Sequence, residues 1–267
     1  MPDSKHTPEE LLEIAIKASL EAGEAIIDIY NSNDLNIDVK SDNSPLTKAD
    51  IASNRVIMKF LTATGIPVLS EEGRAIPFEE RKKWEQLWIV DPMDGTKEFI
   101  KRNGEFTVNI ALIENGKVKM GIVFSPVLKD LYFGLEGLGS YKVSGVSRFS
   151  DDLLLKGSRL PLRKDRSVYT VVSSRSHMST ETENFINELK VKHGEVKLIS
   201  IGSSLKLCMV AEGSADCYPR FAPTMEWDTA AGQGVCEFAG CQVVDWTTKK
   251  TMKYNREDLV NNWFVVV

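Results

Sequence analysis

Two acidic side chains follow directly on an apolar run in the first third of the chain. Residues 87–90 read Leu-Trp-Ile-Val, which predicts a buried β-strand, and Asp91 and Asp94 come next in the segment Asp-Pro-Met-Asp-Gly-Thr. We expect the chain to turn sharply here and to aim both carboxylates into one place. The alternative is an ordinary turn, because Asp, Pro and Gly dominate turns in any protein.

Further carboxylates favour a shared site over a simple turn. A second apolar run at residues 67–70 ends at Glu71, and Asp228 begins a predicted helix rich in small residues. Carboxylates held close together raise one another's pKa, and a divalent cation is the usual way to keep such a cluster ionised. Because the ligands are oxygens, with no matching His or Cys, magnesium or manganese is favoured over zinc.

The first half of the chain predicts helices followed by an antiparallel sheet. Thr7 reads as the N-cap of a long helix, with Glu10 completing a capping box, and this helix should end near residues 31–33. A second helix is expected over residues 51–61. Strands at 107–113 and 117–124 are joined by Asn115-Gly116, which is a strong hairpin signal, and strands at 129–133 and 140–143 continue the sheet.

The second half changes to an alternation of strands and helices, which favours a mixed βα unit. Strands are expected at 168–172, 196–199, 242–244 and 263–267, and helices at 181–189, 203–212 and 229–238, with Ser203 as a possible helix cap. We therefore expect an N-terminal α+β domain over residues 1–150, which carries most metal ligands. A C-terminal α/β domain over 151–267 would contribute Asp228 and the substrate pocket.

Composition restricts the class of partner. A net charge of −5 argues against a broad basic surface, so binding or cleavage of a nucleic acid polymer is disfavoured. No stretch approaches the roughly 20 apolar residues of a membrane span, and no secretory segment is evident, which favours a cytoplasmic protein. The four cysteines form no CxxC pair and are expected to be buried thiols. Peripheral association with the inner face of the membrane, and the oligomeric state, stay open.

Two motifs resemble the inositol monophosphatase-like superfamily of lithium-sensitive, magnesium-dependent phosphatases. One is the W-x-x-D-P-x-D-G-T pattern at residues 88–96, and the other is the W-D-x-A-A-G pattern at residues 227–232. The similarity extends over nearly the whole chain, including the segment at residues 46–50 and the strand end at 70–72. It implies a layered αβαβα sandwich and two or three bound magnesium ions.

The resemblance also implies a role for individual residues. The metal ligands would be Glu71, Asp91, the Met93 backbone carbonyl, Asp94 and Asp228. Thr96 and Asp50 would orient and deprotonate the attacking water, with Glu71 nearby, and the backbone of Gly95 and Thr96 would hold the phosphate. These roles make physical sense, because a pair of cations stabilises both the entering and the leaving oxygen of a phosphoryl transfer, and a carboxylate turns a Thr hydroxyl into a proton relay.

Within the superfamily, residues 94–99, Asp-Gly-Thr-Lys-Glu-Phe, resemble the 3'(2'),5'-bisphosphate nucleotidases. The implied substrate is adenosine 3',5'-bisphosphate, cleaved to AMP and phosphate in sulfur assimilation or nucleotide recycling. The substrate contacts would come from Gly95, Thr96, Ser174, His177, Gly202, Lys206 and Asp228. The sequence shows no basic cluster that would bind the second phosphate of this substrate. The candidate residues for binding it are Arg175, Lys97, Lys206 and Arg220. An inositol or sugar monophosphatase, and a non-catalytic phosphate- or metal-binding protein, are the alternatives.

Overall fold

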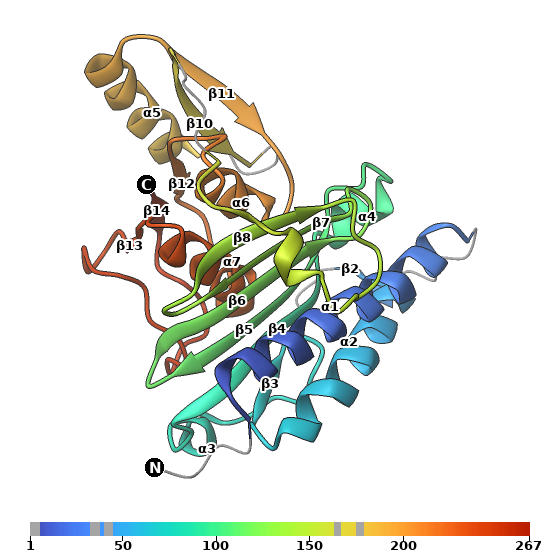
Figure 1. Ribbon diagram of the computed structural model, residues 1–267. Helices are drawn as coiled ribbons and strands as arrows, with labels where there is room; N and C mark the ends of the chain where they lie inside the picture. The colour runs from blue at the N-terminus through green and yellow to red at the C-terminus, as the bar shows by residue number, and fades with distance from the viewer. Residues whose placement is uncertain (1–5, 33–37, 40–44, 163–166, 175–178) are drawn as a thin grey trace.

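The chain folds into alternating layers of helices and sheets. The computed structural model describes residues 6–32, 38–39, 45–162, 167–174 and 179–267. Helices α1 (Pro8–Tyr30) and α2 (Lys48–Leu61) cover one face of a large sheet, α6 (Leu205–Ala211) and α7 (Glu226–Phe238) lie on its other face, and a second sheet and α5 (Thr180–His193) follow (Figure 1). This order confirms the predicted α+β layered sandwich.

The large sheet contains seven of the described strands, in the order β3-β4-β5-β6-β7-β8-β9. Pairing is antiparallel from β4 onward, and β3 joins β4 in parallel. Asn115 and Gly116 both adopt positive φ, 50° and 74°, as the predicted hairpin between β5 and β6 requires. The strands are β3 (Val68–Ser70), β4 (Gln86–Asp94), β5 (Thr107–Glu114), β6 (Lys117–Ser125), β7 (Asp130–Leu135), β8 (Gly139–Ser144) and β9 (Ser158–Arg159).

A smaller mixed sheet forms in the second half. Strands β10 (Tyr169–Ser173) and β11 (Val196–Ser200) pair in parallel, while β12 (Tyr218–Arg220), β14 (Phe264–Val266) and β13 (Val243–Asp245) pair antiparallel in that order. A bridge between Val171 and Cys217 links the two groups. The mixed βα unit expected from the sequence is therefore confirmed.

Short elements complete the description. They are β1 (Asp38–Val39), β2 (Pro45–Leu46), η1 (Thr62–Thr64), α3 (Phe78–Arg81), α4 (Thr96–Ile100) and η2 (Leu154–Lys156).

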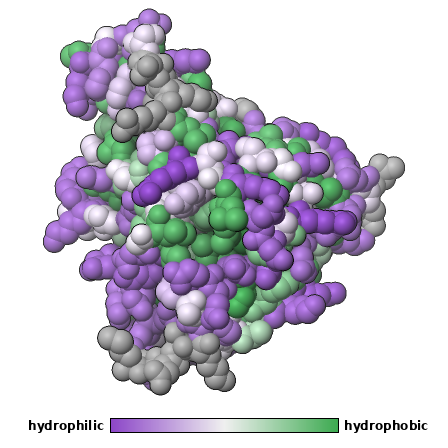
Figure 2. All heavy atoms as spheres, viewed as in Figure 1, coloured by the Kyte–Doolittle hydropathy of each residue, from purple (hydrophilic) through white to green (hydrophobic). Residues whose placement is uncertain are grey.

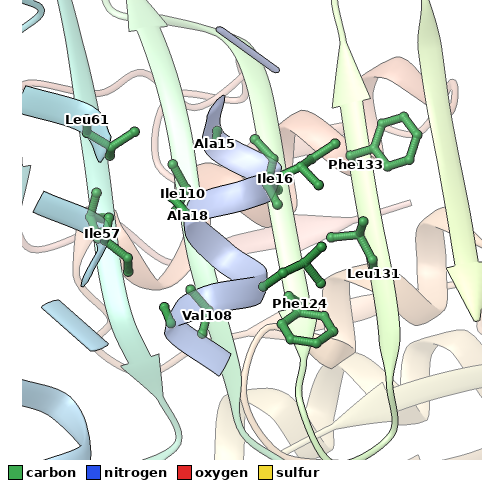
Figure 3. Packing of buried hydrophobic residues seen from close by; sticks show 14 of the residues in the cluster. Ala15, Ile16, Ala18, Ile57, Leu61, Val108, Ile110, Phe124, Leu131 and Phe133 are labelled. Atoms are coloured by element: carbon green, nitrogen blue, oxygen red, sulfur yellow. The ribbon is translucent and has the colours of Figure 1, made fainter. Parts of the chain in front are cut away.

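Alternation along the strands divides the core between the layers. Trp88 and Val90 of β4 point to α1 and α2, whereas Leu87 and Ile89 face the layer of α6 and α7, as a side-chain period of two requires. Figure 3 shows the first of these interfaces, in which α1 and α2 lie against the sheet. The labelled residues are Ala15, Ile16, Ala18, Ile57, Leu61, Val108, Ile110, Phe124, Leu131 and Phe133.

Long helix α1 begins where the sequence predicts. Thr7 and Glu10 form both hydrogen bonds of the capping box, and Asn31 caps the other end. None of the helices in the described ranges is long and apolar enough to span a membrane. Hydrophilic residues cover most of the face shown in Figure 2, with a group of hydrophobic residues near its middle. All four cysteines are free, and three are buried.

Candidate metal centre and phosphate pocket

A β-bulge in β4 brings Asp91 and Asp94 together. In a regular strand, two residues three positions apart would point to opposite faces. Here Asp91 pairs with Asn109 and Asp94 with Thr107, so β4 has one more residue than β5 across this interval, and the extra residue restores a common face. The segment predicted as a sharp turn after the strand is therefore a bulge inside it. Pro92 fits there because a proline in a strand is confined to edges and bulges.

The bulge is held by two hydrogen bonds, one from α2 and one within the bulge itself. The Ser53 hydroxyl of α2 donates to the Pro92 carbonyl at 2.6 Å, and the Met93 N–H donates to Asp91 Oδ1 at 3.0 Å. The Met93 side chain lies in the hydrophobic core, so its backbone is the part available to a ligand. Its carbonyl stays a predicted ligand.

Glu71 and Asp228 approach the bulge from other elements. Glu71 follows β3, and its N–H donates to the Val90 carbonyl of β4, which places it next to Asp91. Asp228 lies in the first turn of α7, where its Oδ2 accepts the Met225 N–H at 2.8 Å. Oxygen atoms of Asp91, Asp94 and Asp228 all lie within 4.8 Å of one another.

Burial and mutual repulsion make this cluster unfavourable in its ionised form. Burial raises the pKa of Asp91 well above its usual range, and the charges of Glu71, Asp94 and Asp228 raise it further. Burial and Asp94 likewise raise the pKa of Asp228 to about 8. The pKa of Asp94 is also raised by burial, while Lys206 and a hydrogen bond from Ser204 act in the opposite direction.

The cluster has the composition of a site for a hard divalent cation. Carboxylate oxygens are the ligands that magnesium prefers, and three of them converge within the span that a single ion can bridge. A positive ion would also remove the repulsion that raises these pKa values. Asp91, Asp94 and Asp228, with Glu71 beside them, therefore fit a divalent cation.

Thr96, two residues after Asp94, is in contact with Asp50. Thr96 Oγ1 is 3.3 Å from Asp50 Oδ1, although the two residues come from α4 and α2. The other oxygen, Asp50 Oδ2, accepts the Thr47 N–H and the Thr47 hydroxyl, both at 2.7 Å. The carboxylate is thus fixed by the start of α2 while it contacts the Thr96 hydroxyl.

A pocket of about 140 Å³ opens beside Asp94 and Asp228. Of the residues expected to contact the substrate, Gly95, Ser174, Gly202, Lys206 and Asp228 line it, and Lys97 and Arg220 also do so. Thr96 is not among the described residues that line the pocket; its hydroxyl contacts Asp50. His177 and Arg175 lie outside the described residues.

Gly202 and Ser203 shape the wall of this pocket. Gly202 has no room for a side chain, because a Cβ would lie 2.7 Å from the Glu105 carbonyl oxygen, and its N–H donates to Glu105 Oε2 at 2.8 Å. The expectation that Ser203 caps a helix is wrong: α6 begins at Leu205, Ser204 is its N-cap, and Ser203 has a φ of 50°. The left-handed backbone at Ser203 could not be anticipated from its residue type.

Two cationic side chains, Lys206 and Arg220, line the pocket together with Asp94 and Asp228. Burial lowers the pKa of Lys206 to about 8; Asp94 opposes this shift and nearby Arg220 adds to it. Lys206 Nζ donates to the Ser203 carbonyl at 2.6 Å, and Arg220 Nη2 donates to the Pro223 carbonyl at 3.1 Å. Arg220 Nε and Ser203 Oγ are buried with no hydrogen-bond partner in the part of the chain that the structure describes.

Sequence reasoning missed two residues at the carboxylates. The Ser204 hydroxyl lies 2.9 Å from Asp94 Oδ2, and the Asn109 side-chain amide lies 2.9 Å from that hydroxyl. Asn109 is on β5, directly opposite Asp91 of β4. The predicted hairpin joins β5 to β6, so no expected pairing placed Asn109 near the site.

A layered fold with an acidic centre at a strand bulge defines a class of proteins, and the chain belongs to the inositol monophosphatase family, whose model matches residues 7–265. It is 46% identical over 260 residues to the 3'(2'),5'-bisphosphate nucleotidase CysQ of Salmonella typhimurium, covering 96% of this chain and 99% of that protein.

Solved structures show the same relationship. A crystal structure of CysQ from Bacteroides thetaiotaomicron, a bacterial member of the inositol monophosphatase family, has 51% identity and a TM-score of 0.88, covering 95% of each chain. An inositol monophosphatase from Zymomonas mobilis, at 21% identity, shares the fold with a TM-score of 0.74 over 98% of this chain and 94% of that one.

Proposed function

We propose that the protein is a magnesium-dependent 3'(2'),5'-bisphosphate nucleotidase, which removes the 3'-phosphate of adenosine 3',5'-bisphosphate to leave AMP and phosphate. The observation that carries the choice of substrate is the pair Lys206 and Arg220, which lines the same pocket as Asp94 and Asp228. The similarity to the CysQ nucleotidases supports it.

A second phosphate explains the two cations better than a neutral ring does. Lys206 is buried and the nearby charge of Arg220 lowers its pKa, so an anion bound between these two cations would be favourable. The unpartnered Arg220 Nε and Ser203 Oγ add two groups that could bind phosphate oxygens. An inositol monophosphate has hydroxyl groups where a nucleoside bisphosphate has its second phosphate.

The carboxylate cluster beside the pocket, with Thr96 and Asp50, would carry out the hydrolysis. Bound cations would neutralise the carboxylate cluster and stabilise the charge that develops on the transferred phosphoryl group. Glu71, Asp91, Asp94 and Asp228, with the Met93 carbonyl, would hold two or three magnesium ions. Thr96 would position the attacking water and pass its proton to Asp50, and the backbone of Gly95 and Thr96 would bind the scissile phosphate.

A substrate comparison tests the proposal. We expect the purified protein with magnesium to hydrolyse adenosine 3',5'-bisphosphate with a higher kcat/KM than adenosine 3'-monophosphate or inositol 1-phosphate. Replacing Arg220 with Ala should remove about 10-fold or more of the preference for the bisphosphate over the 3'-monophosphate, because a hydrogen bond to a charged group is lost. The variant Arg148→Ala, at a surface ion pair with Glu24, is the matched control and should keep the preference.

Two outcomes would separate the competing functions. A preference for inositol 1-phosphate would replace our substrate with that of an inositol monophosphatase. A lack of hydrolysis of all three esters, with ligand binding retained, would indicate the non-catalytic phosphate-binding protein. Inhibition by millimolar lithium, a cytoplasmic location and a role in sulfur assimilation are parts of the same proposal, and the lithium arm can be run in the same assay.

A further inference from the structure

The Ser204 hydroxyl occupies the junction of three elements that build the cation site. Its Oγ lies 2.9 Å from Asp94 Oδ2 on β4 and 2.9 Å from the Asp228 carbonyl oxygen on α7. The third neighbour is Asn109 of β5, whose Nδ2 donates to Ser204 Oγ at 2.9 Å. Ser204 and Asn109 are both 1% exposed, so water does not compete for these contacts.

The hydroxyl has one proton for two acceptors. Asn109 Nδ2 is a donor, so Ser204 Oγ must accept from it and can donate either to Asp94 Oδ2 or to the Asp228 carbonyl. The carboxylate is the stronger acceptor, because hydrogen bonds to an ionised group are shorter and stronger than neutral ones. The Ser204 proton therefore points mainly to Asp94 and, as a shared three-centre hydrogen bond, keeps a weaker contact with the Asp228 carbonyl.

The orientation of the Asn109 amide supports this direction. Nδ2 lies 3.5 Å from Asp94 Oδ2, a position in which an amide oxygen would be repelled by the carboxylate. If the amide were turned, its oxygen would take the Ser204 proton and Asp94 would lose its donor. Asn109 thus determines which group receives that proton.

We propose that Ser204, oriented by Asn109, is a positioning residue for the cation site. Its hydroxyl fixes the position of the Asp94 carboxylate relative to the first turn of α7, and so relative to Asp228. This inference rests on the cation site of the proposed function. Asp94 and Asp228 are 134 positions apart in the chain, and the Ser204 hydroxyl contacts both residues at once. Residues that orient metal ligands through hydrogen bonds affect metal affinity strongly.

The test measures magnesium binding directly. The full-length protein, stripped of metal with a chelator and dialysed, is titrated with magnesium chloride by calorimetry. We expect Ser204→Ala to weaken binding by about 10-fold or more, and Asn109→Ala to weaken it in the same direction and by less. Because Asn109 acts through Ser204, the double variant should bind magnesium as the Ser204→Ala variant does. Turnover of Ser204→Ala should recover toward that of the wild type as magnesium is raised.

A matched control separates positioning from loss of stability. The Ser140 hydroxyl is also buried and donates to a carbonyl of α7, that of Val235, at 2.7 Å. Ser140→Ala should lower the melting temperature of the metal-free protein and leave magnesium affinity unchanged. Equal affinity of wild type and Ser204→Ala, or effects of Ser204 and Asn109 that add in full, would overturn the positioning role. A wild-type protein that bound no magnesium would instead overturn the proposed cation site, and with it this inference.

Discussion

Asp50 and Asp228 occupy the same position in their helices. Each is the third residue of a helix and accepts the backbone N–H of the N-cap residue, Thr47 for Asp50 at 2.7 Å and Met225 for Asp228 at 2.8 Å. One carboxylate oxygen is thus held by the start of the helix, which fixes the rotamer of the side chain. A residue that caps a helix is in this way also presented to the site in one orientation.

The contact of Thr96 with Asp50 predicts a specific loss of turnover. Thr96→Val removes the hydroxyl but keeps the shape, so we expect kcat to fall by about 100-fold or more, as for the loss of a proton relay. Magnesium affinity and the melting temperature should change little, because Asp50 keeps both of its contacts with Thr47. Steady-state kinetics on adenosine 3',5'-bisphosphate measure the effect. Thr96→Ser is the control and should retain most of the activity; comparable activity of the Val variant would exclude the relay.

At the scale of elements, the parts of the fold specified by local sequence were predictable. The capping box at Thr7 and Glu10, and the Asn115-Gly116 hairpin, depend on residues a few positions apart, and both are confirmed. The Thr47-x-x-Asp50 pattern is a similar local signal that would have placed the start of α2 correctly. Asp91, Asp94 and Asp228, which were predicted to share a site, are brought together by the structure. Their roles as metal ligands, and that of Glu71, stay predictions.

Long-range contacts account for what the sequence could not show. The bulge at Asp91 to Asp94 is defined by its pairing with β5, which is not visible in the local sequence. The run of charged residues at 79–83 has the composition of a solvated surface segment. Yet Arg81 is 3% exposed, and its guanidinium donates to the Asn255 side chain and to the carbonyls of Arg256 and Glu257. Partners more than 170 positions away leave no local pattern. The roles of Asn109 and Ser204 were missed for the same reason.

Close packing of α7 on the large sheet predicts the effect of a single methyl group. A Cβ on Gly121 of β6 would overlap the carbonyl oxygen of Ala231, and Gly234 of α7 lies against the same strand. We expect Gly121→Ala to destabilise the protein by about 1–3 kcal/mol, the usual cost of overpacking. Because α7 carries Asp228, magnesium affinity should fall as well. Chemical denaturation and magnesium titration measure the two effects.

A glycine in an open turn provides the comparison for Gly121. Gly145 has a φ of +75° and nothing within 4 Å of an added Cβ, so Gly145→Ala should cost about 1 kcal/mol from backbone strain alone and leave magnesium affinity unchanged. A Gly121→Ala variant as stable as Gly145→Ala would show that α7 can shift away from the sheet without cost.

At the scale of the whole molecule, the site is assembled from both halves of the chain. Asp91 and Asp94 come from the large sheet, whereas Asp228 comes from α7 and Lys206 from α6. The carboxylates repel one another, so in the absence of cations the two halves meet at a destabilised junction. Cation binding should therefore stabilise the entire fold, beyond any local effect on the site.

The sign of this linkage follows from the direction of the pKa shifts. Asp91, Asp94 and Asp228 have a raised pKa in the folded state, so between their unfolded and folded pKa values the folded protein binds more protons. Their contribution to stability is complete below about pH 4, the pKa of an unfolded Asp, and is lost as the pH rises through the folded values. Lys206 has a pKa lowered to about 8, so below that pH it is protonated in both the folded and the unfolded state and contributes little to the pH dependence of stability.

We therefore expect the metal-free protein to melt a few degrees lower at pH 7.5 than at pH 6. Magnesium should raise the melting temperature more at pH 7.5 than at pH 6, because fewer protons then compete for the carboxylates. Calorimetric scans with chelator and with magnesium at both pH values measure the two changes. Glu226 and Glu237 also have a raised pKa and contribute with the same sign, so the variant Asp228→Asn isolates the cluster. This variant should show a smaller loss of stability between the two pH values and a smaller gain from magnesium. A larger gain at pH 6 than at pH 7.5 would contradict the linkage, because cation binding would then not depend on ionised carboxylates.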